Sequence, residues 1–531
     1  MRNGEILRIA NGTVVDGTGA PAFAGDVVIA GERIADVLPS ASAPRPGADE
    51  TVIDATGALV TPGFIDAHAH SDAYLVLEPS APSKISQGVT TEINGQCGGS
   101  VAPRYGEARL SSDWAALLGE RLTWRSLAEY REVLAAAKPA VNTVQFVGHN
   151  TLRSSVVGYA GRAATADELS RMERLLAQSL DEGGWGLTTG LIYQPGKYST
   201  PAEVTALARV AAAKGGFYAT HMRSEGDRIL ESIDEVLALV RATGIRAEIS
   251  HLKTGGARNW SKIDAVLAKM EAAVSAGELL GSDRYPFCAA GTDLDVVLPD
   301  WAQEGAAKAE CERLADSATR ARLVAEIDAQ DRDWATVTIG GTWSPANRRF
   351  CGRAVADILA EGGFSSPGEL VCSILEGDGC KTGAFFFTMC EANLGRILAE
   401  PWIVPGSDAS LRAPWGPLGA DHPHPRAYAT MPEFYRRLTA GPAPIASREE
   451  AVARMTRVPA ERFGIRSRGV LAKGAFADVA VWREGEFAGR ATYVEPHRFS
   501  SGVDCVIVNG TVTYRGGEFT GDRAGRFLER A

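Results

Sequence analysis

Between residues 61 and 466, short apolar segments rich in β-branched residues alternate with segments of helical periodicity. The strand candidates are residues 141–147, 186–191, 216–221, 247–251 and 402–408. The helix candidates are residues 164–182, 200–214, 227–243 and 263–276. Such alternation is typical of a parallel sheet covered by helices. We therefore predict an α/β fold and interpret residues 61–466 as a TIM-like (β/α)8 barrel.

Both ends of the chain carry a different pattern, in which short runs of alternating apolar and polar residues are separated by turn signals. The runs before residue 61 include 6–9, 26–29 and 51–54, and those after residue 466 include 478–481 and 503–514. These features predict short antiparallel strands. Because neither end has enough strands for a stable sheet, we predict that residues 1–60 and 467–531 pair in one small β-sandwich.

Residues 290–401 interrupt the strand and helix alternation. The interruption is much longer than a usual connection between a strand and a helix. We predict an inserted lobe over these residues, placed above the active face of the barrel as a candidate lid.

Potential metal ligands follow several of the predicted strands. The chain has only eight histidines, and four of them stand where an apolar strand-like segment ends. The candidates are His68, His70, Cys97, His221, His251 and Asp408. The carboxyl ends of parallel strands form one face of a barrel, and enzymes with this fold carry their active sites on that face. Imidazole and thiolate together suit Zn²⁺, whereas a carboxylate can bind metal or accept a proton from water. This pattern predicts a metal-dependent hydrolase.

Composition excludes several other classes of function. The net charge of −10 and the lack of a Lys/Arg run argue against nucleic-acid binding. No apolar run approaches the ~20 residues that span a bilayer, so we expect no membrane association and a cytoplasmic location. The eight cysteines include no Cys-x-x-Cys pair, and we predict neither a disulfide framework nor a structural zinc knuckle.

Several motifs occur together and in order along nearly the whole chain. They include Gly-Phe-Ile-Asp-Ala-His-Ala-His at 63–70, Tyr-Ala-Thr-His-Met-Arg-Ser-Glu-Gly at 218–226, Ile-Ser-His-Leu-Lys at 249–253 and His-Pro-His-Pro-Arg at 422–426. In this combination the chain resembles the N-acyl-D-amino-acid deacylase (D-aminoacylase) family of the amidohydrolase superfamily. The resemblance implies zinc-dependent hydrolysis of the amide bond of an N-acyl-D-amino acid. The preference for D substrates comes from the resemblance alone.

The resemblance also assigns the ligands to two metal sites. It implies one tightly held zinc on Cys97, His221 and His251, and a second, weaker site on His68, His70 and Asp408. Three ligands leave one tetrahedral position open for water, as catalytic zinc requires. We expect Asp408 to accept a proton from that water and to deliver it to the departing amine.

The predicted substrate is a small molecule with a free carboxylate. Lys253 and Tyr285 match the positions at which the family binds this carboxylate. Arg223 and Arg412 are further cations in loops of the predicted active face, where either could bind an acidic side chain by a bidentate pair. A structural salt bridge is an equally good interpretation of both arginines.

Some features depart from the family pattern or leave alternatives open. Ala409 follows Asp408 where glycine is usual, and Glu92 stands where an apolar strand residue is usual. The predicted strand at 186–191 has no lysine, which argues against a carboxylated-lysine bridge and leaves Cys97 to reach both metals. This feature disfavours the main alternative, a hydantoinase-like or dihydroorotase-like cyclic-amide hydrolase. A non-catalytic binding protein is a further alternative, and the sequence does not indicate an oligomeric state.

Overall fold

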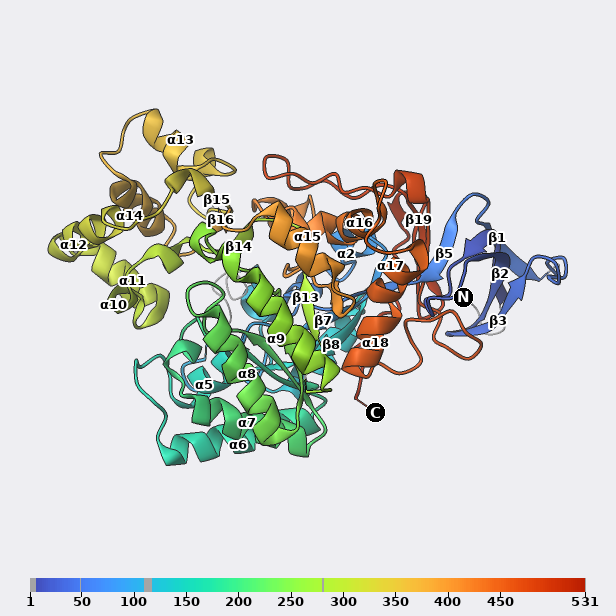
Figure 1. Cartoon of the computed structure of the whole chain (residues 1–531), viewed down its shortest axis with the longest axis horizontal. Helices are drawn as coiled ribbons and strands as arrows, with labels where there is room; N and C mark the ends of the chain where they lie inside the picture. The colour runs from blue at the N-terminus through green and yellow to red at the C-terminus, as the bar shows by residue number, and fades with distance from the viewer. Residues whose placement is uncertain (1–5, 48, 109–116, 279–280, 531) are drawn as a thin grey trace.

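The computed structural model describes residues 6–47, 49–108, 117–278 and 281–530 (Figure 1). Two parallel sheets lie at its centre. The first has the order β6-β7-β8 and the second the order β17-β13-β12-β11-β10-β9. Their strands are β6 (Phe64–Asp66), β7 (Val89–Asn94), β8 (Asn142–Gln145), β9 (Val147–Gly148), β10 (Gly186–Gly190), β11 (Phe217–His221), β12 (Arg246–Ile249), β13 (Gly281–Arg284) and β17 (Ile403–Pro405).

Backbone contacts link the two sheets. Phe146, between β8 and β9, donates its amide to Asn94 O at 3.0 Å, so β8 and β9 continue one another beside β7. At the opposite edges, the Ala67 amide donates to Pro405 O at 3.0 Å, and Ala69 and Ala409 form a parallel bridge. The loops that follow β6 and β17 therefore lie side by side.

The four predicted helices of this region are confirmed. They are α6 (Ala166–Asp181), α7 (Pro201–Ala213), α8 (Ile229–Thr243) and α9 (Ile263–Ser275), and they cover the outside of the second sheet (Figure 1). Helix α7 begins with a capped first turn, because the Thr200 hydroxyl accepts the Glu203 amide and Pro201 occupies the first helical position. Further helices among the described residues of this part are α1 (Tyr74–Leu77), α2 (Pro82–Ile85), α4 (Leu127–Ala137), α5 (His149–Val156), α15 (Glu391–Ala399), α16 (Arg426–Thr439), α17 (Arg448–Met455) and α18 (Arg457–Phe463).

Strands from both ends of the chain form one nine-stranded sheet at the right of Figure 1. Its strands are β1 (Ile6–Val14), β2 (Phe23–Ala30), β3 (Arg33–Pro39), β4 (Glu50–Asp54), β5 (Leu59–Pro62), β18 (Val479–Trp482), β19 (Val503–Val508), β20 (Thr511–Arg515) and β21 (Glu518–Phe519). The two ends meet where β18 pairs antiparallel with β5. The expectation that all these strands are antiparallel is wrong, because β4 and β5 pair parallel with β1.

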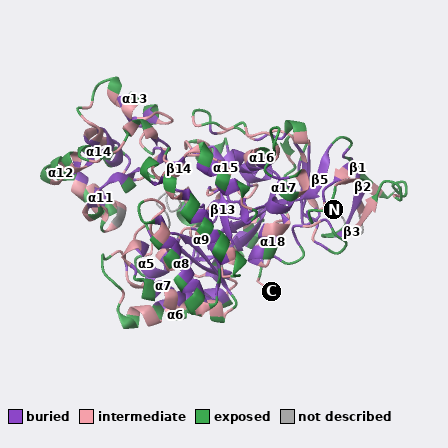
Figure 2. Cartoon of the chain, in the orientation of Figure 1, coloured by how far each residue is buried: buried purple, intermediate pink, exposed green. Residues whose placement is uncertain are grey.

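Apolar residues from both ends fill the same core. Ile9 and Ile29 pack in one cluster with Val479, Val481 and Ile507. Burial of this apolar surface stabilises the pairing of strands that are far apart in sequence. Figure 2 shows that buried residues are concentrated on the strands of the molecule, with exposed residues on the outer turns of the helices.

A lobe projects at the upper left of Figure 1. It contains a small antiparallel sheet of order β14-β16-β15 and five helices. The elements are β14 (Ala290–Asp293), α10 (Asp300–Gln303), α11 (Ala306–Ala315), α12 (Ser317–Asp328), β15 (Val337–Ile339), α13 (Val355–Ala360), α14 (Pro367–Gly377) and β16 (Gly383–Phe386). The lobe has its own apolar cluster, which runs from Leu294 to Phe386. The following helix, α15, instead packs Leu394 and Ile397 into the main core.

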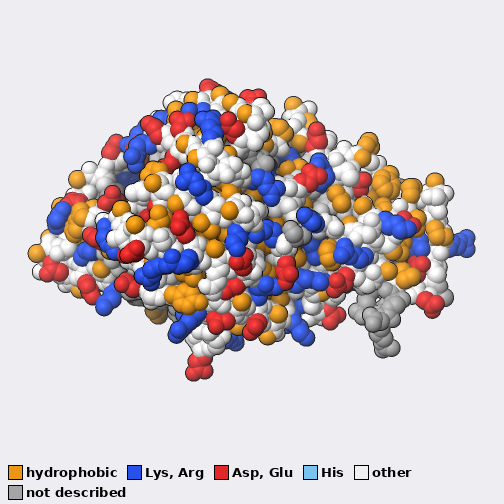
Figure 3. Space-filling view, turned by 90° about the horizontal axis from the view of Figure 1, so that it is seen from below, with side chains coloured by type: hydrophobic (Ala, Val, Ile, Leu, Met, Phe, Trp, Pro, Cys, Tyr) orange, Lys and Arg blue, Asp and Glu red, His pale blue; other side chains and the backbone are white. Residues whose placement is uncertain are grey.

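None of the described helices combines the length and apolar character needed to cross a membrane. Acidic and basic side chains are interspersed over the described residues of the face drawn in Figure 3. This mixture of signs is typical of a solvated surface.

Candidate metal centre

Six predicted ligands converge in two clusters that share one residue. His68, His70, Cys97 and Asp408 form the first cluster, and Cys97, His221 and His251 form the second. Within each cluster the donor atoms all lie within 4.8 Å of one another. Cys97 Sγ lies 3.3 Å from both His68 Nε2 and His251 Nε2, and 3.8 Å from His221 Nδ1. These distances place the thiol between the two sets of imidazoles.

The strand ends hold these ligands by means of unusual backbone conformations. Cys97, His251 and Asp408 have φ values of 51°, 36° and 49°, in the left-handed region that residues with a side chain rarely adopt. Such strain persists where the surrounding structure enforces it, and it is concentrated at functional sites. Gly98, beside Cys97, has a φ of 76° and lies so close to Asn150 that an added Cβ would be 2.5 Å from Asn150 Oδ1. Only glycine fits this position.

The carboxylate of Asp283 contacts the His68 imidazole on the nitrogen that faces away from Cys97. His68 Nδ1 lies 3.2 Å from Asp283 Oδ2, which leaves Nε2 facing Cys97. Asp283 Oδ1 also accepts the backbone amide of His251 at 3.0 Å. One carboxylate therefore fixes ligands on two different strand ends, in the manner of the outer partners of metal-binding histidines.

Glu225 contacts both histidines of the second cluster. Its Oε1 lies 2.9 Å from His251 Nδ1 and its Oε2 lies 3.4 Å from His221 Nε2. Lys253 Nζ donates to the same Oε1 at 2.5 Å. Burial raises the pKa of Glu225, but the charges of His221 and Lys253 oppose it and hold that pKa well below its usual range. Sequence analysis missed this residue, although it lies four positions after His221.

Neighbouring charges favour the ionised form of the Cys97 thiol. Burial alone would raise its pKa, but the neighbouring charges of His68 and His251 lower the pKa of Cys97 well below its usual range. Thiolate is the form that binds metal ions. A thiolate surrounded by imidazoles is a donor set that suits Zn²⁺, so the residues present fit this ion.

Asp408 lies at the edge of the first cluster. Its Oδ1 is 3.1 Å from His70 Nε2 and 3.5 Å from His68 Nε2, and its Oδ2 is 2.7 Å from Arg426 Nη1. Burial raises the pKa of Asp408, but Arg426 and the histidines overcome this effect and lower that pKa well below its usual range. The role of Arg426 was not predicted, although it lies in the His-Pro-His-Pro-Arg motif.

The predicted carboxylate-binding residues are buried beside the centre. Lys253 Nζ is occupied by Glu225 and also lies 2.8 Å from His251 Nδ1. The Tyr285 hydroxyl has no hydrogen-bond partner among the described residues. The Arg426 guanidinium lies 4.6 Å from the centre of the Tyr285 ring. Arg426 therefore lies between Asp408 and the ring of Tyr285. Like Arg223, Tyr285 and Lys253 are not among the described residues that line the central cavity.

The two other predicted cations differ in position. Arg223 forms a bidentate pair with Glu235, at 3.1 and 3.0 Å, and is not among the described residues that line the central cavity. Its contacts favour the structural interpretation. Arg412 lines the cavity, lies 3.1 Å from Asp421 and packs over the Tyr74 ring.

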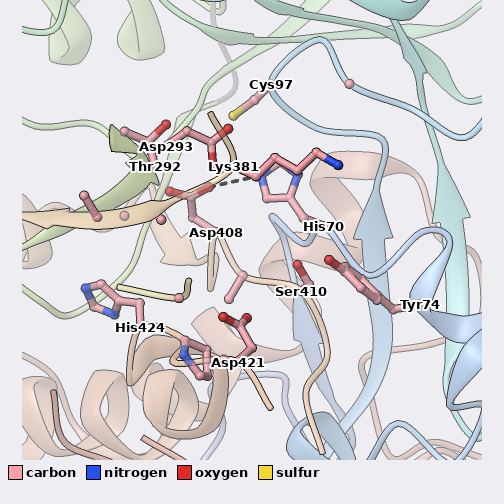
Figure 4. Close-up of a pocket in the computed structure, with 18 of the residues that line it drawn as sticks. His70, Tyr74, Cys97, Thr292, Asp293, Lys381, Asp408, Ser410, Asp421 and His424 are labelled. Carbon is pink, nitrogen blue, oxygen red and sulfur yellow. Dashed lines mark hydrogen bonds and ion pairs between the residues drawn. The ribbon is translucent and has the colours of Figure 1, made fainter. Parts of the chain in front are cut away.

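A cavity of about 730 Å³ opens beside the metal centre (Figure 4). His70, Cys97 and Asp408 form part of its wall, and Figure 4 shows the imidazole of His70 facing the carboxylate of Asp408. The lobe supplies another part of the wall. Its contributions include Thr292, Asp293, Trp343, Lys381 and Phe385. The lobe therefore bounds the space in which a substrate can meet the ligands.

The unexpected carboxylate of Glu92 has a buried partner. Lys84 Nζ lies 3.0 Å from Glu92 Oε1 and 2.8 Å from Asp66 Oδ2, and all three side chains are almost completely buried. Lys84 also donates to Ser407 Oγ and Ala409 O at 3.0 Å. This ion network ties the end of β6 to the loop that carries Asp408.

Three of the four remaining histidines, His149, His422 and His424, have other partners. His149 Nε2 lies 2.9 Å from Glu203 Oε1. His422 and His424 line the cavity, but their Nε2 atoms lie within hydrogen-bond distance of backbone carbonyls, those of Tyr493 and Ala289. Among the described residues, none of the three belongs to a cluster that could hold a metal.

The geometry agrees with comparisons to known proteins. Residues 51–514 match the sequence model of the amidohydrolase family. The chain belongs to the amidohydrolase family. It is 35% identical to the N-acyl-D-glutamate deacylase of Alcaligenes xylosoxydans xylosoxydans over 99% of this chain and 96% of the relative. It is 33% identical to the D-aminoacylase of the same organism over 99% of this chain and 97% of the relative.

Solved structures of similar enzymes superpose on this amidohydrolase over nearly their whole length. A D-aminoacylase with a binuclear metal centre superposes with a TM-score of 0.81 at 34% identity, covering 99% of both chains. The N-acyl-D-glutamate deacylase of Bordetella bronchiseptica, solved with zinc and a phosphonate inhibitor, also has a TM-score of 0.81, at 32% identity and 99% coverage of both chains. The α/β fold is therefore the fold of these enzymes.

Proposed function

We propose that this amidohydrolase hydrolyses the amide bond of N-acyl-D-amino acids with the help of zinc, releasing a carboxylate and a free D-amino acid. The observation that carries the proposal is the convergence of Cys97, His221 and His251 within 4.8 Å beside a cavity that Asp408 also lines. The deacylase relatives over 99% of the chain support the reaction and the D stereochemistry.

Cys97, His221 and His251 would hold the tightly bound zinc, and His68, His70 and Asp408, with Cys97 shared, a weaker second ion. When bound, zinc supplies a Lewis acid that polarises a carbonyl and activates water. We infer that the three-ligand site serves catalysis, because it leaves a coordination position open.

Asp408 would carry the protons of the reaction. Its carboxylate lines the cavity and is kept ionised by Arg426, so it can accept a proton from the attacking water. The same carboxyl group then donates this proton to the amine nitrogen as the C–N bond breaks. One carboxylate can serve both halves of the reaction because it faces the cavity in which both groups are held.

The free carboxylate of the substrate would bind near Tyr285 and Lys253. The hydroxyl of Tyr285, which is unpaired among the described residues, would supply a donor, and the guanidinium of Arg426, which pairs with Asp408 and lies 4.6 Å from the centre of the Tyr285 ring, would supply a cation. Lys253 would contribute its positive charge at a distance, because its ammonium group already donates to Glu225. Arg412 is the cation best placed to contact the substrate side chain, whereas Arg223 is paired with Glu235.

We further propose that the eight strand positions from β6 to β17 form one (β/α)8 barrel. The contacts of Phe146 with Asn94 and of Ala67 with Pro405 support this arrangement. Residues 61–466 would constitute the barrel, residues 1–60 with 467–531 the small β-domain, and residues 290–401 the inserted lid. The cytoplasmic location stays a prediction.

A panel of N-acetyl amino acids in both enantiomers tests this function. Release of free amine from D substrates by the zinc-loaded protein is the expected result. Turnover confined to L substrates, or to cyclic amides such as hydantoins, would contradict the proposed substrate.

A further inference from the structure

The side chain of Glu225 lies between the two histidines of the second cluster and touches both on the nitrogen that faces away from Cys97. His251 presents Nε2 to Cys97 Sγ at 3.3 Å and Nδ1 to Glu225 Oε1 at 2.9 Å. His221 has the opposite orientation, with Nδ1 3.8 Å from Cys97 Sγ and Nε2 3.4 Å from Glu225 Oε2. The two rings therefore face the thiol through different nitrogens.

The orientation of each ring determines which of its nitrogens must carry the proton when a metal is bound. A neutral imidazole binds a metal through the nitrogen that carries no proton, so the proton must stand on the other nitrogen. His221 must then carry its proton on Nε2 and His251 on Nδ1, which are opposite tautomers. An acceptor is needed at both positions, and each of the two oxygens of Glu225 lies at one of them. His221 Nε2 has no hydrogen-bond partner among the described residues, and Glu225 Oε2, at 3.4 Å, is an acceptor within reach of it.

Lys253 completes the arrangement. Its ammonium group lies 2.5 Å from Glu225 Oε1 and 2.8 Å from His251 Nδ1. An ammonium group only donates, so it would compete with the metal-binding tautomer of His251 if it stood alone. The carboxylate accepts from both groups, and the positive charge of Lys253 offsets the cost of burying the negative charge of Glu225.

We propose that Glu225 is the positioning residue of the zinc site, and that it selects opposite tautomers in His221 and His251 so that both rings direct a lone pair toward Cys97. The inference rests on the proposed function for the identity of the metal. It assigns Glu225 no contact with the substrate. Lys253 acts in this arrangement as the counter-ion of Glu225, in addition to any role toward the substrate carboxylate.

Zinc affinity of the Glu225→Gln protein tests the role directly. Glutamine keeps the size of the side chain but has one acceptor oxygen in place of two, so one of the two imidazoles loses its acceptor. Loss of such an outer partner weakens metal affinity about 10- to 100-fold, measured by competition with a chromophoric chelator. Glu231→Gln is the matched control, because Glu231 is exposed in the first turn of α8 and should leave affinity unchanged.

Cobalt substitution supplies a second measurement that does not depend on turnover. The thiolate-to-cobalt charge-transfer band reports the bond to Cys97, and the d–d bands report the geometry set by the imidazoles. In Glu225→Gln we expect the charge-transfer band to remain and the d–d bands to shift. Glu225→Asp, which keeps two acceptor oxygens on a shorter stem, should bind zinc with an affinity between those of Glu225→Gln and the unchanged protein.

The outcomes separate the two proposals. If Glu225→Gln binds zinc as tightly as the unchanged protein and gives the same cobalt spectrum, the positioning role is wrong and the proposed function stands. If the unchanged protein binds no zinc, both are wrong. Should Glu225→Gln not fold, Glu225→Asp decides by the same criterion, and an unaltered zinc affinity in that variant overturns the positioning role.

Discussion

Arg426 Nη1 lies 2.7 Å from Asp408 Oδ2, and this ion pair stands at the wall of the central cavity. The guanidinium holds the carboxylate in its ionised form, while Oδ1 of the same carboxylate stays beside His70. A carboxylate that is ionised and directed at the metal ligands is suited to accept a proton.

Asp408→Asn should lower kcat by roughly 10²- to 10⁴-fold, the usual contribution of a general base. Zinc should remain bound, because Cys97, His221 and His251 converge without Asp408. Steady-state kinetics and metal analysis of the same sample check both statements. Asp300→Asn is a control, since Asp300 is exposed and paired with Lys197; a kcat for Asp408→Asn close to that of this control would refute the assignment.

Removal of zinc should abolish turnover. Dialysis against a strong chelator should take away the ion that we propose Cys97, His221 and His251 bind, and activity should return when zinc is added back. Circular dichroism should show that the fold survives, because a large apolar core holds it together without the metal. Full turnover by a protein without measurable metal would contradict the mechanism.

Tyr285→Phe should raise KM for N-acetyl-D-amino acids with little change in stability. The hydroxyl has no partner among the described residues, so its removal breaks no internal hydrogen bond. A hydrogen bond to a charged group contributes ~1.5–3 kcal/mol, which corresponds to a rise in KM of about 10- to 100-fold. Tyr105→Phe, at an exposed site, is the control. An unchanged KM would show that this tyrosine does not bind the substrate.

Lys84→Met should destabilise the protein by about 3–5 kcal/mol, because it leaves the buried carboxylates of Asp66 and Glu92 without their counter-ion. Lys269→Met removes an ion pair with Asp234 near the surface and should cost no more than about 1 kcal/mol. Urea denaturation of the two variants measures the difference. Equal midpoints would mean that the Lys84 network adds nothing to stability.

Arg412→Met and Arg223→Met should affect substrate choice differently. Arg412 lines the cavity, and we expect its loss to lower kcat/KM for an acidic side chain about tenfold relative to an aliphatic one. Arg223 is held by Glu235, so its loss should leave this ratio unchanged. N-acetyl-D-glutamate and N-acetyl-D-leucine are the substrates to compare. The opposite result would place Arg223 at the side-chain site.

Local patterns predicted the parts of the structure that local forces determine. Helices α6 to α9 lie where the helical periodicity indicates. The parallel pairing of β1 with β4 and β5 was missed, because a strand's sequence records which face is buried but not its partner or direction. The order of these strands depends on contacts between distant segments.

The same limit applies to the candidate site. Histidines are rare in this chain and stand at strand ends, so His68, His221 and His251 could be identified as candidate ligands. Acidic residues and arginines are common, and only the fold distinguishes Glu225 and Arg426, which touch the candidate ligands, from the many others on the surface. Residue type alone therefore identifies candidate metal ligands better than it identifies the residues that contact them.

The pairing of β5 with β18 gives this chain a particular order of assembly. Residues 59–62 leave the ribosome long before residues 479–482 are made, so the first strands wait with an open edge while the rest of the chain is synthesised. Their apolar faces are completed only when the last segment arrives. Shortening the protein at its end should therefore expose the strands at its beginning, and truncated chains should aggregate through those strands.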